Sequence, residues 1–293
     1  MATLLTGGTG KTSVRVARLM QEAKLPFLLA SRRGPDAAPA GMPAVKFDWL
    51  DASTYSKPFE HRFPGGESIS AVYMMNPVVD EPETSMNAFV DYAIKHHGIK
   101  RFVLVAGSSA EPGKKGVGNV WKHFLDTGVD YAVLRPTWFM ENYTEEAARF
   151  IVRDQDKIIT ACGEGQIPFV SASDIAAVAF RTLTDKKPHN TDYRILGPEL
   201  LTHDDQRKQL AAKLSHALGR KIANVKLSEQ ERYDGLIAAG LPEHFARFFT
   251  NLEVATAGGF ETRTNNVVEQ VTGRPPKSFD TFAEENKAVW QKE

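Results

Sequence analysis

The first residues of the chain form a glycine-rich loop that could hold a phosphate group. Gly7, Gly10 and the small Ser13 lie three residues apart, directly after an apolar run over residues 2–6. In a Rossmann turn the first glycine bends the chain, and the second lets the backbone approach a pyrophosphate at the N-terminus of the next helix. Ser13 replaces the third glycine of that pattern and is small enough for close packing of helix on strand. We therefore predict a dinucleotide-binding turn.

A competing motif overlaps this loop. Gly10-Lys11-Thr12 resembles the end of a P-loop. A P-loop also requires an earlier glycine that bends the backbone around a phosphate, and this chain has Leu5 at that position, inside the apolar run. The spacing therefore favours the dinucleotide turn.

The residues about 20 positions after the loop select the cofactor. A protein that binds NAD places a carboxylate there for the ribose 2′-hydroxyl, whereas this chain has Ser31, Arg32 and Arg33. Arginine presents a planar fork of donors to phosphate oxygens. The alternative is that the two arginines lie solvated on a surface turn. The sequence predicts NADP(H) rather than NAD(H).

The tyrosine and lysine pair with which short-chain dehydrogenases protonate an alkoxide is absent. None of the 7 tyrosines is followed four residues later by a lysine. A reductase without such an acid is poorly suited to a carbonyl, because the oxyanion that forms needs a proton donor. An iminium ion carries its own positive charge, accepts hydride and leaves a neutral amine without any proton transfer. The missing pair therefore favours a C=N substrate.

Short runs of β-forming residues alternate with helical patterns over the first half of the chain. We predict strands over residues 2–6, 27–31, 44–48, 69–75, 102–106 and 131–135. Apolar residues from Met86 to Ile94 follow a helical period, and Gly98 stands where that helix would end. Strand followed by helix, five times over, predicts a doubly wound parallel sheet of the α/β class.

Helices dominate after residue 136, and strands are sparse (residues 157–160 and 192–196). One helix should end at Gly219. We expect an NADP-binding Rossmann domain over residues 1–155, and a smaller, mostly helical substrate-binding lobe over residues 156–293 on the carboxyl edge of the sheet, where such sheets bind ligands.

Composition excludes several classes of protein. The 36 basic residues balance the 36 acidic ones, so no net field attracts nucleic acid or anionic lipid. No apolar run is long enough for a membrane span, and the start lacks a signal-peptide pattern, so we expect a cytoplasmic protein. The single Cys162 excludes an intrachain disulfide, and no histidine or cysteine spacing predicts a metal site.

Three segments resemble the NmrA-like branch of the atypical short-chain dehydrogenases. They are the start TLLTGGTGKTS, residues 128–143 around LRPTWFMENY, and residues 167–179 around IPFVSASDIAAVA. Within that branch the chain is most similar to the festuclavine and agroclavine dehydrogenases of fungal ergot alkaloid pathways, which reduce a cyclic iminium with NADPH. The position where many NmrA-like reductases keep a lysine falls near Val117.

The resemblance implies that the cofactor lies along the carboxyl ends of the strands. It assigns to the pyrophosphate Gly7, Thr9, Gly10, Lys11 and Thr12, and to the 2′-phosphate Ser31, Arg32 and Arg33. It places around the adenine, the ribose and the nicotinamide, in turn, Asp48 and Trp49, Met75 and Asn76, and Ala106 through Ser108 with Pro136 through Trp138.

A run of aromatic residues after Pro136 could line a pocket for a flat cation. Aromatic faces and a carboxylate stabilise positive charge. The candidate substrate-binding residues are Trp138, Phe139, Met140, Tyr143 and Phe169, and the candidate polar groups of the catalytic site are Glu141 and Ser108. The alternative for the run is an ordinary core.

Two other functions fit the same residues. A redox-neutral cyclase of the Pictet–Spengler type could retain NADP as a scaffold, with Glu141 as its base. An NADP-sensing regulator related to the founding NmrA proteins would bind the cofactor without turnover. We favour the reductase, with an indole alkaloid intermediate as substrate; the sequence does not decide the oligomeric state.

Overall fold

The computed structural model describes residues 1–204 and 209–292, which divide by their internal contacts into two compact units. Unit 1 comprises Met1–Pro136, Ala172–Ile195 and Val267–Gly273. Unit 2 comprises Thr137–Ser171, Leu196–Asn266 and Arg274–Glu293.

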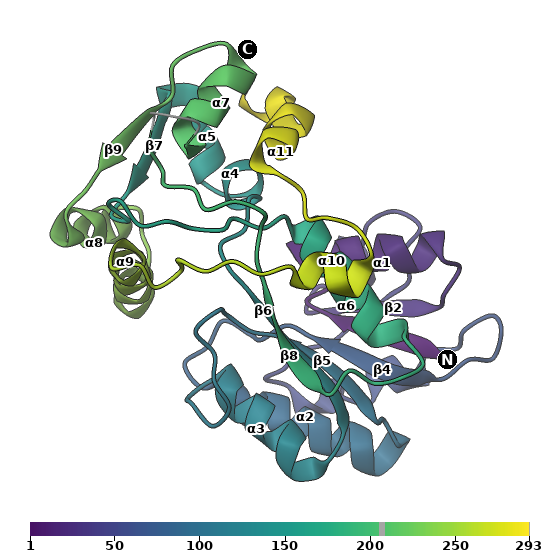
Figure 1. The fold of residues 1–293 in the computed structure, drawn as a ribbon. Helices are drawn as coiled ribbons and strands as arrows, with labels where there is room; N and C mark the ends of the chain where they lie inside the picture. The colour runs from purple at the N-terminus through teal and green to yellow at the C-terminus, as the bar shows by residue number, and fades with distance from the viewer. Residues whose placement is uncertain (205–208, 293) are drawn as a thin grey trace. The chain divides into compact units, whose positions relative to one another are not determined.

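Unit 1 contains a seven-stranded parallel sheet with helices on both faces (Figure 1). The strand order is β3-β2-β1-β4-β5-β6-β8. The strands are β1 (Ala2–Thr6), β2 (Phe27–Ser31), β3 (Ala44–Lys46), β4 (Ile69–Met74), β5 (Arg101–Val105), β6 (Asp130–Pro136) and β8 (Thr191–Ile195). The order reverses between β1 and β4, and doubly wound sheets bind ligands outside such a reversal. The predicted fold class is confirmed.

Helices cover both faces of this sheet. α1 (Lys11–Glu22) and α6 (Ala172–Thr184) pack against each other on one face, and α2 (Pro82–His97) and α3 (Val117–Thr127) pack against each other on the opposite face (Figure 1). Every residue of β1 is buried, as expected for a continuous apolar strand between two helical layers. α2 ends at Gly98 as predicted, and the φ of 64° at this residue is one that glycine adopts at little cost.

Two crossovers differ from the prediction of a helix after every strand. The chain passes from β2 to β3 through the 3-10 helix η1 (Gly34–Ala37), and from β3 to β4 through η2 (Ala52–Thr54) and η3 (Lys57–Glu60). Pro35, Pro39 and Pro43 crowd the first connection. Proline lacks the N–H that a continuing α-helix needs, so only a short 3-10 turn forms there.

The chain also returns to unit 1 after unit 2 has begun, which the single predicted boundary after residue 155 does not describe. β8 pairs with β6 from Ala132 opposite Thr191 to Pro136 opposite Ile195. Without β8, the N–H and C=O groups of β6 would form an unpaired edge. The short helix α10 (Val267–Thr272) returns as well and packs on α6 and β8.

Unit 2 is mostly helical, with a small parallel sheet of β7 (Lys157–Thr160) and β9 (Ala223–Lys226). Its helices are α4 (Asn142–Glu145), α5 (Ala148–Gln155), α7 (Leu210–Leu218), α8 (Glu229–Ala238), α9 (Glu243–Ala257) and α11 (Phe279–Asn286). β7 and the end of α7 at Gly219 agree with the sequence prediction, whereas β9 was not predicted. Within the described ranges, no helix has the length and apolarity that a membrane crossing needs.

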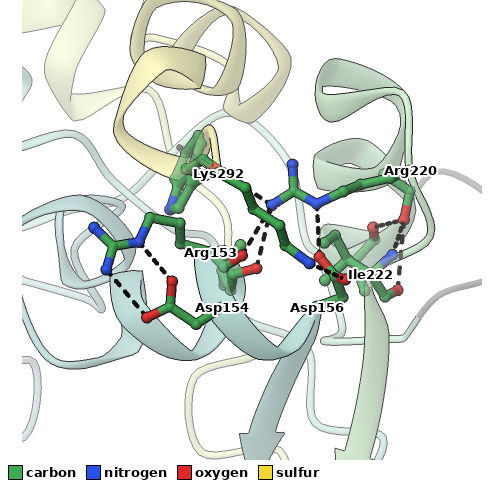
Figure 2. A network of polar contacts seen from close by, with 10 residues as sticks. Arg153, Asp154, Asp156, Arg220, Ile222 and Lys292 are labelled. Carbon is green, nitrogen blue, oxygen red and sulfur yellow. Dashed lines mark hydrogen bonds and ion pairs between the residues drawn. The ribbon is translucent and has the colours of Figure 1, made fainter.

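A polar network holds the C-terminal segment of unit 2 (Figure 2). The Arg220 guanidinium donates to Asp156 Oδ1 at 2.6 Å and to the carbonyl of Trp290 at 2.8 Å. Lys292 donates to the other oxygen of Asp156 at 2.7 Å. Trp290 is fully buried, and its Nε1 donates to the carbonyl of Tyr143 at 2.7 Å. The Asp156 carboxylate thus joins the end of α5 to Arg220, which follows α7, and to Lys292 in the C-terminal segment.

The hydrogen bonds from Lys292 and Arg220 lower the pKa of Asp156. A carboxyl whose pKa is depressed by folding stabilises the fold above its unfolded pKa, and that contribution disappears as the pH falls through the folded value. Asp156→Asn should therefore lower the free energy of unfolding by about 1 kcal/mol at neutral pH, a modest figure because the side chain is one-third exposed. Below about pH 4 the difference should shrink towards zero.

Urea unfolding across this pH range measures the effect. Asp154→Asn is the matched control, because Asp154 pairs with Arg153 on the surface and should matter less. An equal loss from both variants, or a loss from Asp156→Asn that persists in acid, would contradict the assignment.

Candidate active site

The loop after β1 has the geometry of a pyrophosphate cradle. Gly7 adopts a φ of +66°, and the N–H of Gly10 donates to the carbonyl of Gly7 at 2.7 Å. A Cβ on Gly7 would lie 2.9 Å from the Cβ of Met75, so conformation and space both require glycine. Gly10 is the N-cap of α1 and brings no side chain to the first N–H groups of that helix. Such a helix start suits an anion.

Ser13 fills the position of the third glycine. It is fully buried, and its hydroxyl donates to the carbonyl of Thr6 at 2.8 Å. The side chain therefore ties α1 to the end of β1 instead of keeping the two apart. Serine serves the close packing that the pattern requires.

Thr12 does not present its side chain to a phosphate. The residue is 1% exposed, and its hydroxyl accepts a hydrogen bond from the Tyr73 hydroxyl at 2.8 Å and contacts the sulfur of Met75. Only its backbone N–H can serve the role that the resemblance implied. Thr9 is exposed and Lys11 is half-buried at the same loop.

The three residues at the carboxyl end of β2 are at least partly accessible. Ser31 is half-buried at the end of the strand, and Arg32 and Arg33 are exposed. Neither guanidinium has a hydrogen-bond or ion-pair partner among residues 1–204 and 209–292. Two uncommitted arginines at this position fit a 2′-phosphate.

Trp49 belongs to the core more than to an open surface. Its ring packs edge-on against Phe47 and Phe89, at centroid distances of 5.0 and 5.4 Å. Its Nε1 donates to the carbonyl of Met75 at 3.0 Å, which ties the end of β3 to the end of β4. Asp48 accepts from the N–H of Leu50.

Of the remaining predicted cofactor contacts, Asn76 is exposed just after β4, and Ala106 and Pro136 are buried at the ends of β5 and β6. Thr137 and Trp138 belong to unit 2, whereas the other predicted cofactor residues lie in unit 1, at or within a few residues of the carboxyl ends of its strands.

A buried arginine that sequence reasoning missed fixes the loop after β5. Arg135 donates to the carbonyl of Ser108 at 3.0 Å and pairs with Asp192 at 2.8 Å. Its guanidinium also lies 5.5 Å from the centre of the Trp121 ring. The signal was an arginine at the end of an otherwise apolar strand, a position that demands a buried partner. Ser108 is 8% exposed.

Val117, near which the resemblance implied the lysine of many NmrA-like reductases, is the first residue of α3. Val117 packs against the core of unit 1. The neighbouring lysines are used elsewhere: Lys115 lies 3.7 Å from Glu81, and Lys122 pairs with Asp126 at 2.8 Å on an exposed face. Both lysines are therefore engaged with acidic side chains on the surface.

Unit 2 brings the predicted substrate residues together. Met140, Tyr143 and Phe169 are buried, whereas Trp138 and Phe139 are half-buried. The N–H of Met140 donates to the carbonyl of Val170, which joins the two segments.

Glu141 is 2% exposed and accepts a hydrogen bond from the Ser171 hydroxyl at 3.0 Å. Burial raises the pKa of Tyr143 well above its usual value, so this hydroxyl stays protonated in neutral solution.

Sequence reasoning also missed a buried histidine in unit 2. His203 is 1% exposed and lies among the rings of Trp138, Tyr143 and Phe169. Nearby, Glu253 of α9 forms a 2.6 Å ion pair with Arg232 of α8. No spacing in the sequence distinguishes His203 from a surface histidine. Over the described ranges, no group of three histidine, cysteine or acidic side chains could hold a metal ion.

Fungal festuclavine synthases and agroclavine dehydrogenases match the chain over almost its whole length. Festuclavine synthase II from Penicillium roqueforti is 42% identical over 294 residues, which cover 99% of this chain and 100% of the relative. An agroclavine dehydrogenase from Claviceps fusiformis is 40% identical over 295 residues, which cover 99% of both. No family model matches.

Solved structures share the fold. An NADPH-dependent quinone oxidoreductase from Escherichia coli, complexed with NADPH, superposes with a TM-score of 0.78 at 21% identity, over 97% of this chain and 99% of that one. A triphenylmethane reductase from Citrobacter, complexed with NADP(H), gives a TM-score of 0.77 at 21% identity, over 98% and 99% of the two chains. Both carry the cofactor that the residues after β2 predict. From its identity to the two fungal relatives, the chain belongs to the oxidoreductase family of festuclavine synthases and agroclavine dehydrogenases.

Proposed function

We propose that this protein is an NADPH-dependent reductase that transfers hydride to a cyclic iminium of an indole alkaloid intermediate. The observation that carries the proposal is that none of the 7 tyrosines is followed four residues later by a lysine, the pair with which short-chain dehydrogenases protonate an alkoxide. A site without a proton donor suits a substrate whose reduction needs no proton. The fungal relatives support an alkaloid substrate.

The residues of unit 1 bind and orient the cofactor in this proposal. Arg32 and Arg33 hold the 2′-phosphate, and the first N–H groups of α1 hold the pyrophosphate. Arg135 fixes the carbonyl of Ser108 and so the course of the loop that borders the nicotinamide. Bound NADPH supplies the hydride. The electron pair of the C=N bond then moves onto nitrogen, which becomes a neutral amine.

The residues of unit 2 bind the substrate. Trp138 offers an aromatic face to a flat cation, and the Glu141 carboxylate offers negative charge. Because the charge is quenched as hydride arrives, both contacts favour the bound substrate over the transition state. Specificity then resides in the shape and charge of the pocket.

NADPH absorbance during incubation with cyclic indole iminium ions tests the proposal. Oxidation of NADPH with formation of the amine supports the reductase. A cyclised product without oxidation would instead support the cyclase, with Glu141 as base. Cofactor binding with neither outcome would support a sensor.

The accessible arginines predict the cofactor preference. NADPH should bind at least about tenfold more tightly than NADH, which corresponds to about 1.4 kcal/mol. Arg32→Ala combined with Arg33→Ala should remove most of that difference. Arg18→Ala, an exposed arginine of α1, is the matched control and should preserve it. Calorimetry measures the dissociation constants, and equal values for the two cofactors on the unmodified protein would refute the prediction.

The missing acid predicts that no single ionisable residue is indispensable for turnover. Tyr143→Phe and Lys122→Ala should each keep kcat within about tenfold of the parent, a change of less than about 1.4 kcal/mol in the barrier. Glu141→Gln should raise KM more than it lowers kcat, because the carboxylate favours the cationic ground state. Gln can still accept the hydrogen bond from Ser171, so the fold should persist.

Steady-state kinetics with the iminium substrate provides these values. A thousandfold loss of kcat in any of the three variants, with folding and NADPH affinity intact, would reveal a general acid or base and favour a carbonyl reductase or the cyclase.

A further inference from the structure

His203 in unit 2 combines deep burial with an unsatisfied ring nitrogen. Its imidazole lies 5.5 Å from the Phe169 ring, almost perpendicular to it, and 6.4 Å from the rings of both Trp138 and Tyr143. Among the described residues its Nδ1 has no hydrogen-bond partner. A buried polar group left unpaired is unfavourable, so a partner is expected.

Trp138, beside His203, shows the same feature. Its Nε1 is buried and lacks an acceptor within the described ranges, although the residue as a whole is half-buried. Trp290 in the same unit behaves differently, because its Nε1 donates to the carbonyl of Tyr143 at 2.7 Å. Two ring nitrogens without partners among the described residues, in one aromatic cluster, fit a ligand with a polar group on a flat apolar body.

The charge state of His203 determines which ligand group fits. Burial, with a smaller effect from the Arg232 cation, lowers its pKa to about 4, so the ring is neutral in neutral solution. Arg232 itself is paired with Glu253 at 2.6 Å. A neutral imidazole with its proton on Nε2 has an acceptor at Nδ1, and an acceptor recognises an N–H or O–H donor.

We propose that Nδ1 of His203 accepts a hydrogen bond from the indole N–H of the substrate, whose flat ring system lies against Trp138. The inference rests on the proposed function, since it names the contact by which that substrate class is recognised. The N–H of an indole can donate a hydrogen bond but cannot accept one. The aromatic rings around His203 suit the flat apolar body of the indole. His203 is then a specificity-determining residue that handles no proton.

Binding of two matched ligands tests this contact without any turnover. We would measure the dissociation constants of tetrahydro-β-carboline and of its indole-N-methyl analogue, by calorimetry on the protein saturated with NADP. The unmodified protein should bind the N–H ligand about 10- to 100-fold more tightly. His203→Phe and His203→Leu, which remove the acceptor, should reduce this ratio to near one. His203→Gln, which keeps an acceptor, should retain part of it.

His216→Phe is the control, because this histidine is exposed on α7 and should leave the ratio unchanged. Either acceptor-free variant decides the question provided that it folds, which circular dichroism establishes. A ratio near one in the unmodified protein, absence of binding, or a preference that survives in His203→Phe or His203→Leu would overturn the proposal.

Turnover separates this inference from the proposed function. The corresponding cyclic iminium is a dihydro-β-carbolinium that is methylated on its imine nitrogen and keeps its indole N–H. Oxidation of NADPH in its presence reports reduction of the iminium. Preference for the N–H ligand without NADPH oxidation would support the His203 contact and contradict the reductase. Oxidation without any preference for the N–H ligand would support the reductase and overturn the contact.

Discussion

The tight turn between β1 and α1 is the constraint on which the rest of the proposed cofactor site depends. Gly7 bends the chain with a positive φ, the N–H of Gly10 closes the turn on the Gly7 carbonyl, and Ser13 ties the helix back to Thr6. The turn sits where the strand order reverses, between β1 and β4, and Met75 packs directly against Gly7. A side chain at Gly7 would push the loop away from β4 and open the cradle of N–H groups.

Several polar side chains of unit 1 already have partners within the protein. Thr12 is bonded to Tyr73, Arg135 holds Ser108 and Asp192, and Lys122 is paired on the surface. A group already engaged in this way is poorly placed to deliver a proton to a reacting atom. Reduction of a cationic C=N bond requires no such proton transfer. In the proposed site, selectivity can therefore come from contacts with the bound substrate alone.

The predictable features were those with local causes. The sheet strands follow from apolar runs, the end of α2 from a single glycine, and the cofactor turn from the spacing of Gly7, Gly10 and Ser13. The features that could not be predicted depend on long-range contacts. β8 returns to pair with β6, and Arg135 finds its carboxylate 57 residues away at Asp192. His203 could not be recognised either, because only the folded unit surrounds it with aromatic rings.

The proposed reaction is hydride transfer to a cation without a proton-donating side chain. Isotope effects on turnover of a cyclic indole iminium test it most directly, using NADPH that carries deuterium at the transferred position and, separately, D₂O as solvent. The account predicts that deuterated NADPH slows turnover whereas D₂O leaves the rate unchanged. A rate that falls in D₂O together with deuterated NADPH would show a proton moving in the same step and would contradict the account.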